Sequence, residues 1–218
     1  MKLSSKEVKK LDNDILLAVK EAAKSSGYRK RAGIFYKVAN DYFVQIMIYI
    51  TGMQKDKVIV RGTVKPFVAD DVLWDVLQMP SNHSEPISLR ANGAWTIWGL
   101  PVFEETTSYE NSENISSIAQ DFFIKCNEAV MAIVENFREL SDFINYSESY
   151  GKWVDFDSNR ELLLINAGDY QAAKEIAQEQ IRNHVHGRFQ TEKKWVNEHI
   201  VDYCDTALTE VYGVTQNR

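Results

Sequence analysis

Apolar residues between residues 8 and 22 recur at three- and four-residue intervals, the spacing of one helix face. Ser4 and Glu7 precede this run as a capping-box pair, in which each residue satisfies a backbone N–H group of the first turn. Gly27 follows the run and suits a left-handed helix end. We therefore expect a helix between Ser4 and Gly27.

The period changes to alternation directly after this helix. Ile34, Tyr36 and Val38 alternate with Phe35 and Lys37, and Asn40-Asp41 then favours a tight turn. Residues 42–50 are apolar at nearly every position, as in a strand covered on both faces. A third segment, residues 57–65, alternates valines with Lys57, Arg61 and Lys65. These three segments predict an antiparallel meander.

The middle of the chain mixes short elements. Asp70 or Asp71 is placed to cap a short helix that stops near Pro80. Two extended pieces are expected around "PISLR" and "AWTIWGL", and the second would put Trp95 and Trp98 on opposite faces, leaving one of them partly exposed. A polar loop then leads to the longest helix, whose apolar stripe consists of Ile115, Ile118, Phe122, Cys126, Ala129, Ile133, Phe137 and Leu140.

The last third of the chain has helical patterning. "SDFINYSESYGKWVDFDSNR" is polar and turn-rich and is predicted to be a connection. "ELLLINAGDYQAAKEIAQEQI" resembles one helix-turn-helix unit of the tetratricopeptide type, but a solenoid needs at least three such repeats. We predict an α+β fold, with an α+β domain over residues 1–145 and a helical segment over residues 153–218 packed on the same domain.

Composition narrows the class of protein. The 218 residues are 44% hydrophobic and carry a net charge of −6, which disfavours non-specific binding to nucleic acid or to an anionic membrane. Cys126 and Cys204 fall in expected helices and are interpreted as buried thiols of a reducing compartment. The charged N-terminus does not resemble a secretory signal, and the apolar runs are shorter than the ~20 residues of a spanning helix. The sequence therefore predicts a cytoplasmic protein without a membrane partner.

A cationic stretch follows the first helix. Arg29, Lys30 and Arg31, with Tyr28 beside them, could bind phosphates while aromatic rings stack on bases. The acidic balance of the chain argues against nucleic acid, and cations are also favourable at the negative end of a helix. A local anionic partner, such as an acidic protein surface, fits this stretch better than nucleic acid does.

Metal and catalytic motifs are weak or missing. His184 and His186 would share a face on a strand but diverge at a helix end, and "DFDSNRE" departs from a calcium loop at Arg160, where that loop needs glycine. The chain has no GxSxG, GxGxxG, GxxxxGK[ST] or HExxH motif. We expect no metal, no cofactor and no catalytic residue.

One family likeness is visible in these residues. The steps Gly27-Tyr28-Arg29-Lys30, Phe35-Tyr36 and Gln45-Ile46, with the later "LLLINAGDYQAAKEI", resemble the bacterial domain-of-unknown-function family numbered four-three-zero-four. The likeness covers about residues 1–185, and Ala32-Gly33 departs from the more polar pair expected there. The family has no assigned activity, so the resemblance supports the fold and implies little about function.

The leading hypothesis is a protein that binds another macromolecule without catalysis, in its sharpest form an immunity-type inhibitor of a partner toxin. The alternative is an enzyme or small-molecule binder with a site on the sheet, for which Arg61, Glu85, Arg90 and Trp98 are the residues to watch. Nucleic-acid binding through Arg29-Lys30-Arg31 is the third hypothesis. The candidate interaction residues are Tyr28, Arg29, Lys30, Arg31, Arg61, Arg90, Trp98 and Trp153.

Overall fold

The computed structural model describes residues 4–52, 56–109, 114–150 and 156–215. It divides into two units, each built from two stretches of chain. Unit 1 comprises Met1–Lys65 and Gly99–Arg138, and unit 2 comprises Pro66–Trp98 and Glu139–Arg218. The fold is α+β, as predicted. Residues 66–98, which the sequence analysis placed with residues 1–145, group with the C-terminal helices in unit 2.

Unit 1 contains a five-stranded sheet in the order β1-β2-β3-β4-β5. The strands are β1 (Arg29–Arg31), β2 (Ile34–Ala39), β3 (Tyr42–Thr51), β4 (Lys57–Pro66) and β5 (Leu100–Ser108). The predicted turn at Asn40-Asp41 closes the β2–β3 hairpin. Its two residues have φ of 48° and 64°, and a type I′ two-residue turn requires positive φ at both positions. The meander is confirmed, and the cationic stretch adds β1 as an edge strand.

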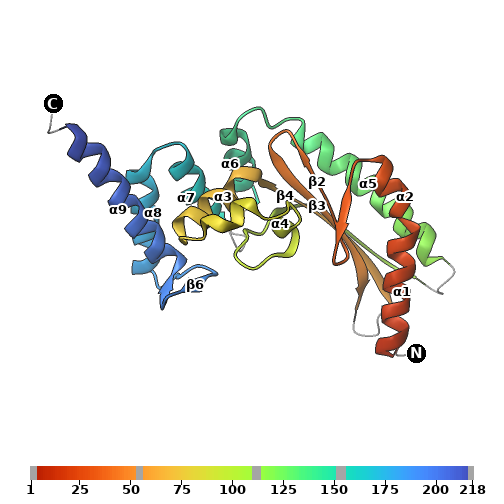
Figure 1. Ribbon diagram of the computed structural model, residues 1–218. Coiled ribbons are helices and arrows are strands. Elements are labelled where there is room, and N and C mark those ends of the chain that lie inside the picture. Colours follow the sequence, from red (N-terminus) through yellow and green to blue (C-terminus); the bar gives the residue numbers. More distant parts are fainter. Residues whose placement is uncertain (1–3, 53–55, 110–113, 151–155, 216–218) are drawn as a thin grey trace. The chain divides into compact units, whose positions relative to one another are not determined.

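Helices α1 (Ser5–Ala18), α2 (Lys20–Ser25) and α5 (Ile115–Val134) lie together beside the sheet (Figure 1). The ring of Phe35 on β2 meets that of Phe123 on α5 at 5.6 Å between centroids. We call the sheet face that bears Phe35 the first face and the opposite one the second face. Side chains alternate along a strand and cross-strand partners share a face, so the register assigns the paired residues of this sheet to one face or the other.

Gly62 lets β4 and α5 approach closely on the first face. A Cβ atom there would lie 2.8 Å from Cys126 Sγ and closer still to Val130 Cγ2. We expect Gly62→Ala to lower the free energy of unfolding by about 1–3 kcal/mol, because overpacking displaces well-packed neighbours.

The Gly62 prediction can be tested by urea unfolding of Gly62→Ala, Val130→Ala and the double variant. Val130→Ala removes a methyl group in the path of the new Cβ, so the double variant should lose less stability than the two single losses combined. Strictly additive losses would contradict this explanation.

Unit 2 is mainly helical. Its elements are α3 (Phe67–Val76), the 3-10 helix η1 (Pro80–Ser84), α4 (Leu89–Asn92), α6 (Leu140–Glu148), α7 (Phe156–Asn166), α8 (Tyr170–Arg182), β6 (Gln190–Thr191), β7 (Lys194–Trp195) and α9 (Val196–Thr215). The helices α7, α8 and α9 pack side by side (Figure 1). Their core also includes α3, and its buried residues are Val72, Leu73, Val76, Leu77, Ile97, Leu162, Ile165, Ala173, Ala177, Phe189, Val196, Ile200 and Cys204.

Several predicted elements are corrected. "PISLR" is a turn leading into α4, and "AWTIWGL" is a loop, because four or five alternating residues do not distinguish a strand from other structure. The polar run that was expected to be a loop lies partly in β5, where threonines suit an edge strand. The longest predicted helix ends at Val134, and α6 forms inside the expected connection because Glu139 and Asp142 make a capping box.

Within the described part of the chain, no helix is both long and apolar enough to cross a bilayer.

Candidate functional site

Trp98 is the large hydrophobic residue of unit 2 that is most exposed among those described, with 55% of its surface accessible. It lies in the loop that joins α4 to β5. The guanidinium of Arg188 lies over its ring, 3.8 Å from the ring centroid, and 4.9 Å from the centroid of Phe189. A cation at this distance over an indole face is held by the ring quadrupole. Trp98 is therefore exposed but not loosely placed.

The loop that carries Trp98 is fixed by hydrogen bonds from α3. Trp74 Nε1 donates to the carbonyl oxygen of Trp95 at 2.7 Å, and the Ile97 N–H donates to Asp70 Oδ1 at 2.8 Å. Trp95 itself has φ of 63°, a left-handed conformation that is unusual for a bulky residue. Such a conformation persists when its surroundings impose it, and it is common at functional sites. The loop therefore presents Trp98 on a rigid base.

Arg188 comes from the segment between α8 and β6. The next residue, Phe189, is buried and packs against Trp95 with 5.7 Å between ring centroids. Gly187 has φ of 82°, and a Cβ there would collide with Val196, so the segment needs glycine at this point. We name Trp95, Trp98, Arg188 and Phe189 the Trp98 surface.

The sequence pattern identified Trp98 but not Arg188. The two residues lie far apart in the chain and meet because α7–α9 and the α4–β5 loop share one core. An isolated arginine between a glycine and a phenylalanine carries no signal of its own.

Arg90 lies inside unit 2, with 6% of its surface accessible. Its guanidinium stands 3.8 Å from the ring centroid of Phe67 and 4.6 Å from that of Trp74. Nη2 donates to Asp71 Oδ1 at 2.6 Å, and Nη1 donates to the Phe67 carbonyl at 2.9 Å and lies 3.6 Å from Asp70 Oδ2. Through these contacts Arg90 joins α4 to α3. Little of the Arg90 surface remains for a partner.

A histidine between two carboxylates is the arrangement most similar to a catalytic site. His83 Nδ1 lies 3.1 Å from Asp71 Oδ1, and Nε2 lies 2.8 Å from Asp75 Oδ1. A general base needs one ring nitrogen directed at a nucleophile, whereas both nitrogens here face carboxylates. The trio therefore attaches η1 to α3. Its three residues follow no catalytic spacing, so the sequence carries no signal for it.

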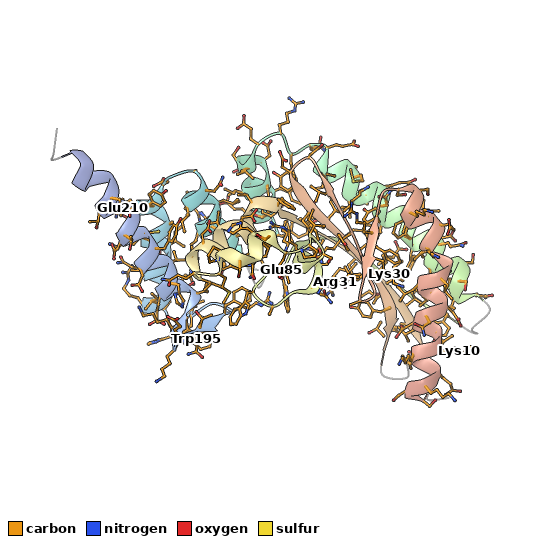
Figure 2. The ribbon with its side chains drawn as sticks, viewed as in Figure 1. Lys10, Lys30, Arg31, Glu85, Trp195 and Glu210 are labelled. Atoms are coloured by element: carbon orange, nitrogen blue, oxygen red, sulfur yellow. The ribbon has the colours of Figure 1, made fainter. Side chains whose placement is uncertain are left out.

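The cationic stretch separates into a core residue and an exposed strand. Tyr28 is buried against Phe123, 5.4 Å between ring centroids, and Lys37 Nζ stands 4.4 Å from its ring centroid. Burial raises the pKa of Tyr28 and lowers that of Lys37, because each group loses water around its charged form. Arg29, Lys30 and Arg31 form β1 and are exposed; Figure 2 labels the last two on this strand.

The remaining candidate residues have these positions. Arg61 on β4 forms an ion pair with Glu104 on β5, with Nη2 2.6 Å from Oε2, at an exposed place on the sheet. Trp153 lies outside the described residues. Glu85 is exposed after η1, and His184 and His186 are exposed between α8 and β6. Among the residues that the structure describes, no three His, Cys, Asp or Glu side chains gather where they could hold a metal.

Both cysteines are buried thiols, as predicted, Cys126 in α5 and Cys204 in α9. Burial raises the pKa of Cys126 to about 12 and that of Cys204 to about 11. A thiol reacts as its thiolate, so raised pKa values make both groups poor nucleophiles.

Formal charge divides unevenly between the units. Unit 2 holds 18 Asp and Glu against nine Lys and Arg, a charge of −9, whereas unit 1 holds 13 against 16, a charge of +3; together they give the −6 of the whole chain. The Trp98 surface belongs to the acidic unit. The exposed cations of β1 belong to the basic unit.

No protein-family model matches the chain, no curated protein matches its sequence, and no solved structure matches its fold.

Proposed function

We propose that this protein binds a partner protein without catalysis, and that the Trp98 surface of unit 2 is its docking site. The observation that carries this proposal is an exposed tryptophan held in place by a stacked arginine and a fixed loop. Tryptophan and arginine are the residues most enriched at the energetic centres of protein interfaces. A side chain that is already ordered loses less conformational entropy on binding.

The partner proposed is a basic protein. Unit 2 carries a charge of −9, which would steer a cationic partner towards it and disfavour acidic competitors. The sharper form of the proposal is an immunity-type inhibitor that neutralises a basic toxin such as a nuclease. The charge of unit 2 and its exposed aromatic anchor support that form.

We expect Trp98→Ala to weaken partner capture at least tenfold, since truncating a central interface tryptophan costs about 2 kcal/mol or more. The measurement is a pull-down from the native host's lysate with tagged wild type and variants, followed by quantitative mass spectrometry. Leu17→Ala is the matched control, because Leu17 is also an exposed apolar side chain, 67% accessible, but lies on α1 of unit 1.

Three results decide the proposal. A basic protein recovered with wild type and Leu17→Ala but lost with Trp98→Ala supports it. Recovery that is equal for Trp98→Ala and wild type contradicts the docking site. A tagged protein that is recovered alone contradicts the function itself.

A further inference from the structure

Cations gather on the second face of the unit 1 sheet. The register places Arg29 opposite Tyr36 and Arg31 opposite Ile34, away from the face that bears Phe35. On β4, a Cβ on Gly62 would point at α5. Side chains alternate along the strand, so the adjacent Arg61 points away from that helix. Lys65 Nζ stands over the ring of Phe43, which pairs with Val38 on the second face. Among described strand residues of this sheet, the second face carries five cations and one carboxylate: Arg29, Arg31, Lys57, Arg61, Lys65 and Glu104.

An apolar floor lies between the two groups of cations. Ile34 on β2 pairs with Met47 on β3, and Tyr49 follows Met47 on the same face. These three side chains are half-buried. The cations at the sides come from β1 and β4, which are three strand spacings apart, or roughly 14 Å. The exposed part of this face is therefore a floor with an aromatic ring, bordered on both sides by cations.

We propose that the second face of unit 1 binds single-stranded nucleic acid, with bases on the floor around Tyr49 and backbone phosphates at Arg29 and Arg31. A flat ring accepts any base by stacking, and guanidinium groups pair well with phosphates. A duplex keeps its bases stacked on one another, so it has no base to place on the floor. The proposal is independent of the Trp98 surface.

The charge of the whole chain does not oppose this site. Dissolved salt screens charges that are more than about 8–10 Å apart at physiological ionic strength, so the local surface decides the attraction of a phosphate. Unit 1 has a charge of +3, and its second face has four more cations than carboxylates. Arg29, Arg31 and Lys57 are the exposed cations of this face, so they are the ones that a phosphate can reach.

Lys30 provides a matched control on the same strand. It pairs with Phe35, so it lies on the first face, although it is as exposed as its neighbours. Each single alanine substitution at residues 29, 30 and 31 removes one positive charge from the same edge strand. The three variants therefore differ in the face from which the charge is lost.

The experiment measures the fluorescence anisotropy of a labelled oligouridylate of about 20 nucleotides, longer than the 4–16 nucleotides of one typical single-strand site. We expect the affinity to fall with salt at a slope of about −2, as three phosphate contacts on a single strand predict. Arg29→Ala and Arg31→Ala should each weaken binding about three- to tenfold and reduce that slope by about 0.7. Lys30→Ala should change the affinity less than twofold, and Tyr49→Leu, which keeps an apolar side chain but removes the ring, should weaken it about fivefold.

Three results would overturn the proposal. The first is no binding at protein concentrations up to about 100 µM, the weak end of non-specific nucleic-acid affinity. The second is a loss of affinity with Lys30→Ala that equals the loss with Arg29→Ala or Arg31→Ala. That result would assign binding to the charged edge strand and not to the second face. The third is equal competition by polyglutamate of similar length, which would make the face a site for acidic protein segments. None of them bears on the pull-down with Trp98→Ala.

Discussion

Replacing Arg90 by alanine is expected to lower the free energy of unfolding by about 3–5 kcal/mol, because the variant removes a buried guanidinium that pairs with two carboxylates. Asp70 has none of its surface accessible, and Arg90 Nη1 lies 3.6 Å from its Oδ2. The variant also loses the stacking against Phe67 and Trp74. Urea unfolding followed by circular dichroism measures the loss.

Arg188→Ala is the matched control for Arg90→Ala. Both arginines stack on a tryptophan, but Arg188 does so at the half-exposed Trp98 surface, where such a contact contributes at most about 1 kcal/mol. Arg90→Lys should recover only part of the loss, since an ammonium cannot stack between two rings or donate in the geometry of a guanidinium. Equal losses for Arg90→Ala and Arg188→Ala would show that the buried ion pairs do not stabilise unit 2.

Stability should also fall steeply above pH 9. The ordinary pKa of a thiol is 9.0, and burial raises that of Cys126 to about 12 and that of Cys204 to about 11. A raised native pKa means that the folded protein keeps a proton which the unfolded chain has released. The stability that each buried thiol contributes is therefore fully present below pH 9. It is lost as the pH rises towards 11 for Cys204 and towards 12 for Cys126. For Cys126, three pKa units correspond to about 4 kcal/mol.

The test compares the pH dependence of unfolding in wild type, Cys126→Ala and the double variant that also lacks Cys204. Near pH 10 each buried thiol should contribute a slope of about −1 kcal/mol per pH unit, so each substitution should flatten the profile by that amount. The cavity left by alanine shifts the whole curve and not its slope. Parallel curves for wild type and the double variant would contradict the prediction.

The main elements of unit 1 could be predicted because each has a local signature. The β2–β3 hairpin has alternating residues around Asn40-Asp41, and the first helix has its capping box. β1 could not be predicted, because three consecutive cations have no strand propensity. They form a strand because the turn at Ala32-Gly33 folds them back on the apolar β2.

The candidate site was predictable in part. Two tryptophans three residues apart indicate that one of them is exposed, and the structure shows which one. What fixes Trp98 was not predictable, since its support comes from Asp70 and Trp74 on α3 and from Arg188 near the C-terminus. These contacts form only when distant segments fold together. For the same reason Arg90, an arginine of ordinary sequence context, was predicted on a surface and is found buried.

The interleaved units determine what can happen while the chain is being synthesised. The apolar face of α3, which includes Leu73 and Val76, packs in a core with Leu162 on α7 and Ile200 on α9. At translation rates of about 5–20 residues per second, α3 emerges several seconds before those helices exist. During that interval its apolar side chains have no native partner from the C-terminal helices and are exposed to chaperones and aggregation. A gene fragment that stops near residue 150 would leave α3 in this condition permanently, so neither terminal half of the gene encodes an independently folding piece.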